Sequence, residues 1–472
     1  MTRYVLAACA AALCSCAHPP AYVRPTAAAA PAFKEDPGWK SAAPADEAIR
    51  GDWWTLFGDP ELTRLEAQID VSNQNLKAAE ARFAEARAAL RITRANLYPQ
   101  VTAAPSAVVA RPSGARATTS FHDVYGDILL PGDVSYEIDA WGRIHGTVNA
   151  AVAQAQASAA DVETARLSVH AELALDYFDL RALDRERDLL DQAVANYEQA
   201  LQLTNNRFQG GIASQADVAL AETQLETTRA LAVDEDVQRA ALEHAIAALV
   251  GEPASTFALA RAPIAAAPPA IPAALPSTLL ERRPDVAAAE RRVAAASAQV
   301  GATRAAWFPI LTLSGAAGFE ASSLGKLLST TSTLWSVGPA ALVTVFDGGR
   351  KRAVTAQAQA AYDEAVANYR ETVLTAFRDV EDQLAALNIL GNEAEIQTRA
   401  IAAAQRSLEQ ATNRYRGGLA SYLEVTAAQT AALTSVRTGV GIDLRRLSAG
   451  VLLLKAAGGG WDAQTVRDVA SK

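Results

Sequence analysis

A long internal repeat constrains the fold of this chain more than any other feature. The segment Asn206–Ser214 matches Asn413–Ser421, which lies 207 positions later. Earlier in each half the offset is 210, so that Pro99 corresponds to Pro309. Matches of this length at a nearly constant offset indicate two copies of one structural unit. We therefore expect a fold with two internal repeats of the same architecture.

The repeat divides the 472 residues into consecutive segments. The stretch between the two copies is rich in Pro and Ala, which favours a semi-rigid connection over a helix. Three consecutive glycines after the second copy indicate a flexible tail. The expected segments are a signal peptide at 1–15, a lipidated N-terminal segment at 16–58, a first repeat at 59–250, the connection at 251–276, a second repeat at 277–457 and the tail at 458–472.

The N-terminus has the pattern of an export signal. Arg3 supplies positive charge, and Tyr4–Leu13 is an apolar stretch too short to span a bilayer. Leu13–Cys16 resembles a bacterial lipobox, which predicts that Cys16 carries fatty-acyl chains such as palmitate. Lipidation at Cys9, and an ordinary signal peptide with incidental cysteines, are the alternatives. Acyl chains would tether the mature chain to a lipid bilayer.

Each copy has the pattern of one helix, two strands, one very long helix and a shorter helix. In the first copy the opening helix has Asp59 as N-cap and Pro60 at its first position, and it ends before Pro99. A Gly-Gly turn separates the two later helices of each copy. The expected strands are 100–110, 128–139, 309–319 and 335–346, and the expected later helices are 143–204, 215–250, 350–414 and 422–456.

The first long helix has a coiled-coil pattern. Apolar residues occupy thirteen of sixteen positions spaced alternately by four and three from Val148 to Leu201, and the exceptions are Arg166, Asp176 and Arg187. At 1.5 Å per residue, about 60 residues give a rod of roughly 90 Å. A rod of this length is typical of a protein that bridges a distance, although a purely structural coiled coil has the same pattern.

The four expected strands are too few to close a membrane barrel within one chain. Two short hairpins leave exposed edges, which natural proteins avoid, and membrane barrels usually have at least about eight strands. Closure therefore requires several chains. Trp141, Trp307 and Trp335 lie at strand ends, where aromatic residues often mark a membrane interface, and a place in the core is the alternative.

Four segments carry a resemblance to a known family. Two are the opening segment Asp52–Leu62 and the mid-chain segment Leu279–Val286, which is followed by Ala289 and Glu290. The others are the Phe308–Pro309 junction and the two Gly-Gly turns. Together they resemble the OprM/NodT-like lipoprotein branch of the TolC family of outer-membrane efflux channels, and the likeness covers almost all of the mature chain.

This resemblance implies a mainly α protein with a small β part that assembles as a homotrimer. Four strands per chain would form a 12-stranded transmembrane β-barrel, and the coiled-coil hairpins would form a periplasmic α-barrel. The implied partners are a periplasmic membrane-fusion adaptor and an inner-membrane pump of the resistance–nodulation–division (RND) type. The chain would then be the passive outer-membrane exit duct for drugs or other small toxic compounds.

Other functions remain open on the sequence. Within the duct class, metal export and type I protein secretion are alternatives to drug export. Outside that class, the alternative is a non-conducting, structural coiled-coil lipoprotein of the envelope. Conductance of the purified protein separates the duct from the structural lipoprotein.

The Gly-Gly turns are followed by patterns typical of helix starts. Ser214 with Asp217, and Ser421 with Glu424, each match a capping box. The preceding glycines can end the long helices with positive φ. The resemblance implies that these tips contact the adaptor, through Gly210, Gly211, Ser214, Gly417, Gly418 and Ser421.

The same resemblance implies a periplasmic aperture at the tips. Three copies of Asp217 and Glu424 would ring a narrow pore with negative charge, which attracts cations and makes closure sensitive to pH. Arg414 and Tyr415 would latch the closed state, with a surface or packing role as the alternative. The chain departs from the family pattern at Ala427, where a second Asp is common. The gate is therefore expected to be less acidic or more dependent on apolar packing.

The residue types that catalysis needs are scattered along the chain. The five histidines show no metal-ligand spacing, the mature chain has no cysteine beyond Cys16, and no P-loop or Gly-x-Ser-x-Gly elbow occurs. The net charge of -9 gives no support for nucleic-acid binding. We expect no enzyme activity, no cofactor, no metal and no nucleic-acid partner, so the energy for transport would come from the pump.

Overall fold

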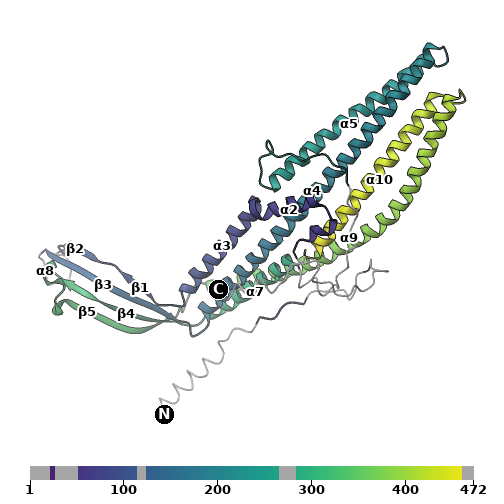
Figure 1. Cartoon of the computed structure of the whole chain (residues 1–472). Coiled ribbons are helices and arrows are strands. Elements are labelled where there is room, and N and C mark those ends of the chain that lie inside the picture. Colours follow the sequence, from purple (N-terminus) through teal and green to yellow (C-terminus); the bar gives the residue numbers. More distant parts are fainter. Residues whose placement is uncertain (1–21, 27–33, 35–50, 114–123, 265–282, 460–472) are drawn as a thin grey trace.

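The computed structural model describes residues 22–26, 34, 51–113, 124–264 and 283–459. The predictions for the signal peptide, for Cys16 and for the last part of the connection and of the tail concern residues outside this description. Within it the chain is mainly helical with a small antiparallel sheet at one end, as the sequence predicts (Figure 1).

Four long helices form two antiparallel hairpins, α4 with α5 and α9 with α10 (Figure 1). Helices α4 and α9 have 67 residues each, which gives rods of about 100 Å. The largest difference from the predicted bounds is the end of α4, predicted at 204 and observed at Gln209. The observed bounds are Arg143–Gln209 for α4, Gln215–Leu249 for α5, Arg350–Arg416 for α9 and Tyr422–Ala456 for α10.

Shorter elements complete the fold. The helical ones are η1 (Trp53–Phe57), α2 (Pro60–Ser72), α3 (Gln74–Ala95), α7 (Pro284–Ala305), α8 (Leu324–Leu327) and η2 (Thr330–Ser332). The strands are β1 (Gln100–Ala103), β2 (Ser106–Ala110), β3 (Tyr125–Ile138), β4 (Ile310–Ala321) and β5 (Thr333–Leu342). Because β1 and β2 both pair with β3, they occupy the place of one interrupted strand.

The helices near the sheet stand in the same order as the strands. The sheet order is β1-β3-β4-β5, with β2 also on β3, and every pairing is antiparallel. Among the helices, α3 packs on α4, α4 on α7, and α7 on α9. Along the chain α3 leads into β1, β3 into α4, α7 into β4 and β5 into α9. The chain therefore forms one wall in which each strand is continued by a helix.

The opening helix differs from its prediction. The sequence predicts one helix from Pro60 to about Tyr98, but the structure has two helices that meet at Asn73. The backbone of Asn73 is extended. Its side-chain amide nitrogen donates to the Leu249 carbonyl at 2.7 Å, and its side-chain oxygen accepts from Leu76 N at 2.9 Å and so caps α3. This break depends on a contact between distant segments, so local sequence could not show it.

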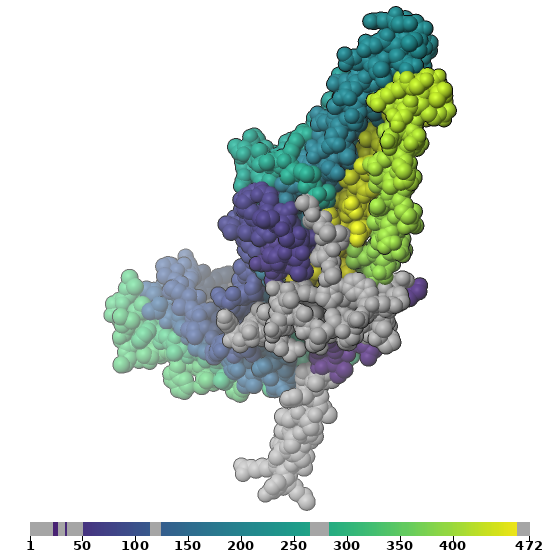
Figure 2. Space-filling model, turned by 45° about the vertical axis from the view of Figure 1, so that its right-hand side comes forward, coloured from purple at the N-terminus to yellow at the C-terminus, as the bar shows by residue number. Residues whose placement is uncertain are grey.

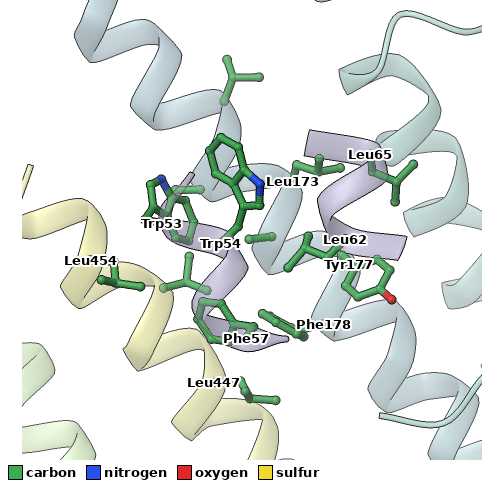
Figure 3. Packing of buried hydrophobic residues seen from close by; sticks show 14 of the residues in the cluster. Trp53, Trp54, Phe57, Leu62, Leu65, Leu173, Tyr177, Phe178, Leu447 and Leu454 are labelled. Carbon is green, nitrogen blue, oxygen red and sulfur yellow. The ribbon is translucent and has the colours of Figure 1, made fainter. Parts of the chain in front are cut away.

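The largest hydrophobic cluster lies where the short opening segment meets the long helices. Side chains of η1, among them Trp53, Trp54 and Phe57, are buried between residues of α2, α4 and α10 (Figure 3). Asp59 caps α2 through Glu61 N and Leu62 N, as the sequence predicts. The opening motif is therefore a structural plug that ties the N-terminal segment to the helical hairpins.

The mid-chain motif contains a buried cation. Arg283, which precedes α7, makes a bidentate pair with Asp285 at 2.6 and 3.0 Å. It also reaches Asp379 of α9 and the Ala456 carbonyl at the end of α10, each at 3.4 Å. Because a buried charge is costly unless it is paired, these contacts fix the start of α7 against α9 and α10.

Candidate functional site

The two faces of the sheet differ in chemistry. Successive residues of a strand point to opposite faces, and directly opposite residues on paired strands share a face. One face carries most of the large apolar side chains of β3, and the register adds apolar residues of β4 and β5 to it. These residues are Ile128, Leu130, Val134, Tyr136, Ile138, Leu311, Leu313, Phe319, Trp335 and Val337.

The other face carries every carboxylate of the described strands. These are Asp127, Asp133 and Glu137 of β3 and Glu320 of β4, which lies opposite Leu129 in the register. The described strands contain no Lys or Arg, and Glu137 pairs with Arg143 at the start of α4 at 2.7 Å. Separation of apolar and polar residues onto two faces is typical of barrel strands that meet lipid on one side and water on the other.

Both edges of this wall are free within the described residues. Strands β1 and β2 form one edge, where they pair only with β3, and β5 forms the other, where it pairs only with β4. In the helical layer that continues the strands, α3 and α9 are the matching edges. An unpaired strand edge is a template for pairing with another chain.

The three tryptophans near the sheet lie outside the buried core. Trp141 donates to the Pro309 carbonyl at 2.7 Å and stacks on Phe308, and Trp307 donates to Thr355 at 3.0 Å. Both therefore join strands to helices at the junction between sheet and helices. Trp335 is 77% exposed on the apolar face, where a membrane-facing aromatic residue would lie.

The two helical hairpins end in tips at the far end from the sheet (Figure 1, Figure 2). Gly211 and Gly418, the second glycine of each pair, have φ of 71° and 75°, a backbone conformation that glycine adopts without strain. Ile212 N donates to the Arg207 carbonyl and Leu419 N to the Arg414 carbonyl, each at 2.8 Å. These bonds are the Schellman closure, which satisfies carbonyls at the ends of α4 and α9.

The first tip contains the predicted capping box. The Asp217 carboxylate accepts from Ser214 N at 2.9 Å and from its hydroxyl at 2.8 Å, and the same hydroxyl caps Asp217 N at 3.2 Å. Asp217 therefore lies at the tip, but its carboxylate is already used to fix the start of α5.

The second tip differs, and the prediction of a capping box there is wrong. The Ser421 side chain makes no cap hydrogen bond, and Glu424 lies 3.4 Å from the Arg414 guanidinium. The attraction between these two charges turns the carboxylate toward the last turn of α9 instead of back to the helix start. The side chains of Arg414 and Glu424 are 56% and 47% exposed, so this pair is weak.

Tyr415 joins the two hairpins. Its ring is only 5% exposed, and its hydroxyl donates to the Thr204 hydroxyl of α4 at 3.3 Å. The Arg207 guanidinium lies 4.7 Å from the ring centroid and donates to the Arg416 carbonyl at 3.1 Å. Tyr422 packs edge-on against Tyr415 with 5.3 Å between ring centroids, and burial raises the pKa of Tyr422 to about 12.

Sequence reasoning placed Arg414 and Tyr415 together in one latch, whereas the structure separates them. Arg414 stays within its own tip, and Tyr415 contacts α4. Thr204, Arg207 and Tyr422 were missed. The repeat held a signal for Arg207, because the offset of 207 aligns it with Arg414.

Neither a metal-ligand cluster nor a membrane-spanning helix is found among the described residues. No three His, Cys, Asp or Glu side chains there converge in a way that could hold a metal ion. None of the described helices combines the length and apolar character that a membrane span requires.

A two-faced sheet with free edges, continued by helices of about 100 Å, is the architecture expected of one chain of a channel-type membrane protein. Comparison with known families supports this class. The model of the outer membrane efflux protein family matches residues 67–252 and 275–459. The chain belongs to this family, and it is a TolC-type channel that serves as an outer-membrane efflux duct. The family is one of channels and not of enzymes.

Named relatives extend this result over nearly the full length. The chain is 32% identical over 457 residues to the outer membrane protein OprJ of Pseudomonas aeruginosa, which covers 95% of this chain and 94% of that one. It is 31% identical over 471 residues to the toluene efflux pump outer membrane protein TtgF of Pseudomonas putida, covering 98% and 97%.

Solved structures of the same type agree with the fold. The outer-membrane channel OprN is 29% identical and superposes with a TM-score of 0.85 over 94% of this chain and 100% of that one. The MtrE channel of Neisseria gonorrhoeae, in its open state, is 26% identical with a TM-score of 0.83, covering 95% and 99%.

Proposed function

We propose that three copies of this chain close into one duct, with a 12-stranded β-barrel in the outer membrane and an α-barrel in the periplasm. The observation that carries this proposal is the shared order of strands and helices, with free edges on the same two sides of the wall. Four effective strands per chain are too few for a barrel, and closure by identical copies satisfies both edges at once.

The proposal includes two internal structural repeats. Leu76, Ala79 and Val162 form a buried cluster between α3 and α4. The offsets of 210 and 207 carry them to Val286, Ala289 and Tyr369, which belong to one buried cluster between α7 and α9. The same packing therefore recurs at corresponding positions of the two halves.

The tips form the periplasmic aperture in this proposal. The contact of Tyr415 with Thr204 and Arg207 holds the two hairpins of one copy together and so favours the narrow state. Asp217 and Glu424 from three copies place negative charge around the opening. Ala427, which is exposed in the single chain, leaves this ring less acidic.

The partners follow from the tips and from the relatives. We propose that the glycine turns and helix starts at Gly210–Ser214 and Gly417–Ser421 contact a periplasmic adaptor, which connects the duct to an inner-membrane RND pump. TtgF is named as part of a toluene efflux pump and OpmQ as a pyoverdine export protein. For this chain we propose drugs and other small toxic compounds as the exported class.

We propose lipidation at Cys16 as an accessory anchor. Arg370 donates to the Thr26 carbonyl, Arg24 donates to the Tyr369 hydroxyl at 3.2 Å, and Tyr22 and Tyr362 pack against the same buried cluster, so the described N-terminal residues follow α9 toward the sheet. Cys16 precedes Tyr22 by six positions, so it lies no more than about 20 Å from it. The rise from Tyr362 back to the start of α9, where the sheet begins, is about 18 Å, so an anchor at Cys16 can reach the level of the sheet.

Two experiments test this function. Light scattering of the purified protein in mild detergent should give the mass of three chains, and a monomer would contradict the closed duct. Deletion of the gene should raise sensitivity to dyes, detergents and antibiotics, and the wild-type gene should restore resistance. Unchanged sensitivity to all of them, with a trimer in detergent, would reject drug export and leave the duct.

A further inference from the structure

The two halves of one chain meet in a seam between α4 and α7. Ala160 of α4 and Ala288 of α7 pack together in this seam and are 0% and 1% exposed. Farther along, Gly146 of α4 approaches Ala302 of α7 so closely that an added Cβ would lie 3.0 Å from the alanine Cβ. The two pairs describe antiparallel helices in one register, because each pair of residue numbers has the same sum, 448.

The repeat offsets carry this seam to the two free edges of the wall. Adding 207 moves the α4 positions to Ala367 and Ala353 of α9, and subtracting 210 moves the α7 positions to Ala78 and Ile92 of α3. All four of these residues are exposed in the single chain, and Ile92 is 72% exposed. The buried alanines Ala160 and Ala288 of the internal seam thus correspond to Ala367 and Ala78, which are exposed to solvent at the two edges of the single chain.

We propose that α3 of one copy packs against α9 of the next copy in this same register, with Ala78 on Ala367 and Ile92 on Ala353. The inference rests on the proposed closed duct and adds which residues of the two copies touch. The internal seam and the seam between copies would then alternate around the ring in the same register. Ala78 and Ala367 are small enough to let the two helix backbones approach closely, whereas Ile92 and Ala353 are larger than Ala302 and Gly146 and would hold the helices farther apart near the sheet.

Charges at the two edges fit this register. In the internal seam Arg292 pairs with Asp161, and one guanidinium nitrogen lies 2.7 and 2.6 Å from the two carboxylate oxygens. The offsets carry the arginine to Arg82 of α3, which is exposed and makes no ion pair within the described part of the chain. They carry the aspartate to Asn368 of α9.

The carboxylates for Arg82 lie one helical turn to either side of Asn368. These are Glu364 and Glu371, which are both exposed on α9. Residues three and four apart are neighbours on a helix surface, so an arginine placed over Asn368 reaches both carboxylates. The edge of one copy therefore offers a cation where the edge of the next offers two anions.

Cysteine cross-linking tests the register in the full-length protein. Ala78→Cys with Ala367→Cys should, on mild oxidation, convert most of the chains into covalent trimers that reducing agent returns to monomers. Ala160→Cys with Ala288→Cys is the matched internal control, which should form a disulfide within one chain and keep the monomer mass. Ala78→Cys with Ala353→Cys tests the register, because its two positions on α9 are about 21 Å apart and it should give little cross-linking.

Mass and conductance of the same samples separate the possible failures. A conducting trimer in which 78 and 367 stay unlinked while 160 and 288 link would overturn the register, and so would equal linking of 78 with 353. A monomer without conductance would remove both the closed duct and this inference. As a second variant, Arg82→Glu should lower the share of trimer in detergent, and Glu364→Arg with Glu371→Arg should restore it.

Discussion

The two hairpin tips have nearly the same sequence and the same backbone closure, but their corresponding arginines make different contacts. Arg207 leaves its own tip to cover the Tyr415 ring and to donate to the Arg416 carbonyl of the other hairpin. Arg414 makes its contact within its own tip, where its guanidinium lies 3.4 Å from the Glu424 carboxylate. In the first tip Arg207 lies on the other hairpin's Tyr415, and Asp217, which corresponds to Glu424, forms a capping box with Ser214 instead of an ion pair.

The aromatic residues next to these arginines differ in the same way. Tyr415 is 5% exposed between the hairpins, whereas Phe208, which corresponds to it at the offset of 207, is 41% exposed. The two tips therefore share one backbone closure, and the neighbours of each tip decide which contacts its side chains make. The contact between hairpins is asymmetric: one tip supplies the buried ring and the other supplies the cation.

The largest effect is expected from Tyr415→Ala. Removal of a buried aromatic side chain costs about 3–5 kcal/mol, and here it also removes the bonds to Thr204 and the surface under Arg207. The hairpins should separate more easily, so the variant should show higher leak conductance and unfold at lower denaturant concentration.

Phe208→Ala is the matched control for this change, because it truncates the corresponding residue at the exposed position. We expect its leak and its stability to stay near those of the wild type. Equal effects of the two substitutions would show that the tips are equivalent and that the asymmetry has no consequence for closure.

A second difference between the halves lies in the core, where His170 corresponds to Phe377. His170 Nδ1 lies 2.6 Å from the Glu66 carboxylate and its ring stacks on Trp54. Burial raises the pKa of Glu66 to about 7, and the His170 hydrogen bond opposes that rise. Because this pKa lies above the usual 4.5, the stability tied to it is present at low pH and is lost as pH rises through 7.

Guanidinium unfolding at a series of pH values measures this loss, which should amount to up to about 3 kcal/mol between pH 4.5 and 8. Glu66→Leu with His170→Phe removes both titratable side chains and places at position 170 the phenylalanine of the second half. That double variant should have a flatter profile over this range. A wild-type profile with no fall would contradict the assignment to Glu66.

A smaller effect is expected at the acidic residues of the aperture. Asp217→Ala removes the bonds from the Asp217 carboxylate to the N-cap Ser214, worth up to about 1 kcal/mol, and Glu424→Ala removes a weak exposed pair. Together they should raise leak conductance and lower the preference for cations, measured as the reversal potential in a salt gradient. The acidic-gate idea fails if both quantities stay at the wild-type values.

The smallest expected effect is the difference in leak conductance between Arg207→Ala and Arg414→Ala. Arg207→Ala removes a contact between hairpins, and Arg414→Ala removes one within a tip that is worth less than about 1 kcal/mol. We expect a measurable rise in leak for Arg207→Ala and almost none for Arg414→Ala. The reverse order would show that the latch lies within the second tip.

Local signals made most of the fold predictable. Pro60 after Asp59, the two Gly-Gly turns and the long apolar periodicity fixed the helix bounds to within a few residues, because caps and breakers act on their own neighbourhood. The break at Asn73 was missed because it depends on the distant Leu249 carbonyl.

The candidate site was only partly predictable for the same reason. Its residues could be placed at the tips, since the turns are local. The partners of Tyr415 lie on another hairpin more than 200 positions away in the chain. The packing of the two hairpins decides which arginine, Arg207 or Arg414, contacts the opposite tip. Of the two residues predicted for the latch, Tyr415 makes contacts between the hairpins and Arg414 makes its contacts within its own tip, and a latch role for either stays a prediction.

In the proposed duct, copies of this chain enclose an open path through the outer membrane. Single-channel recording of the purified, full-length protein in planar bilayers measures whether that path exists. We expect discrete conductance steps with a preference for cations, given that all carboxylates of the described strands lie on one face of the sheet. A protein that inserts as a stable trimer but never conducts would contradict the account.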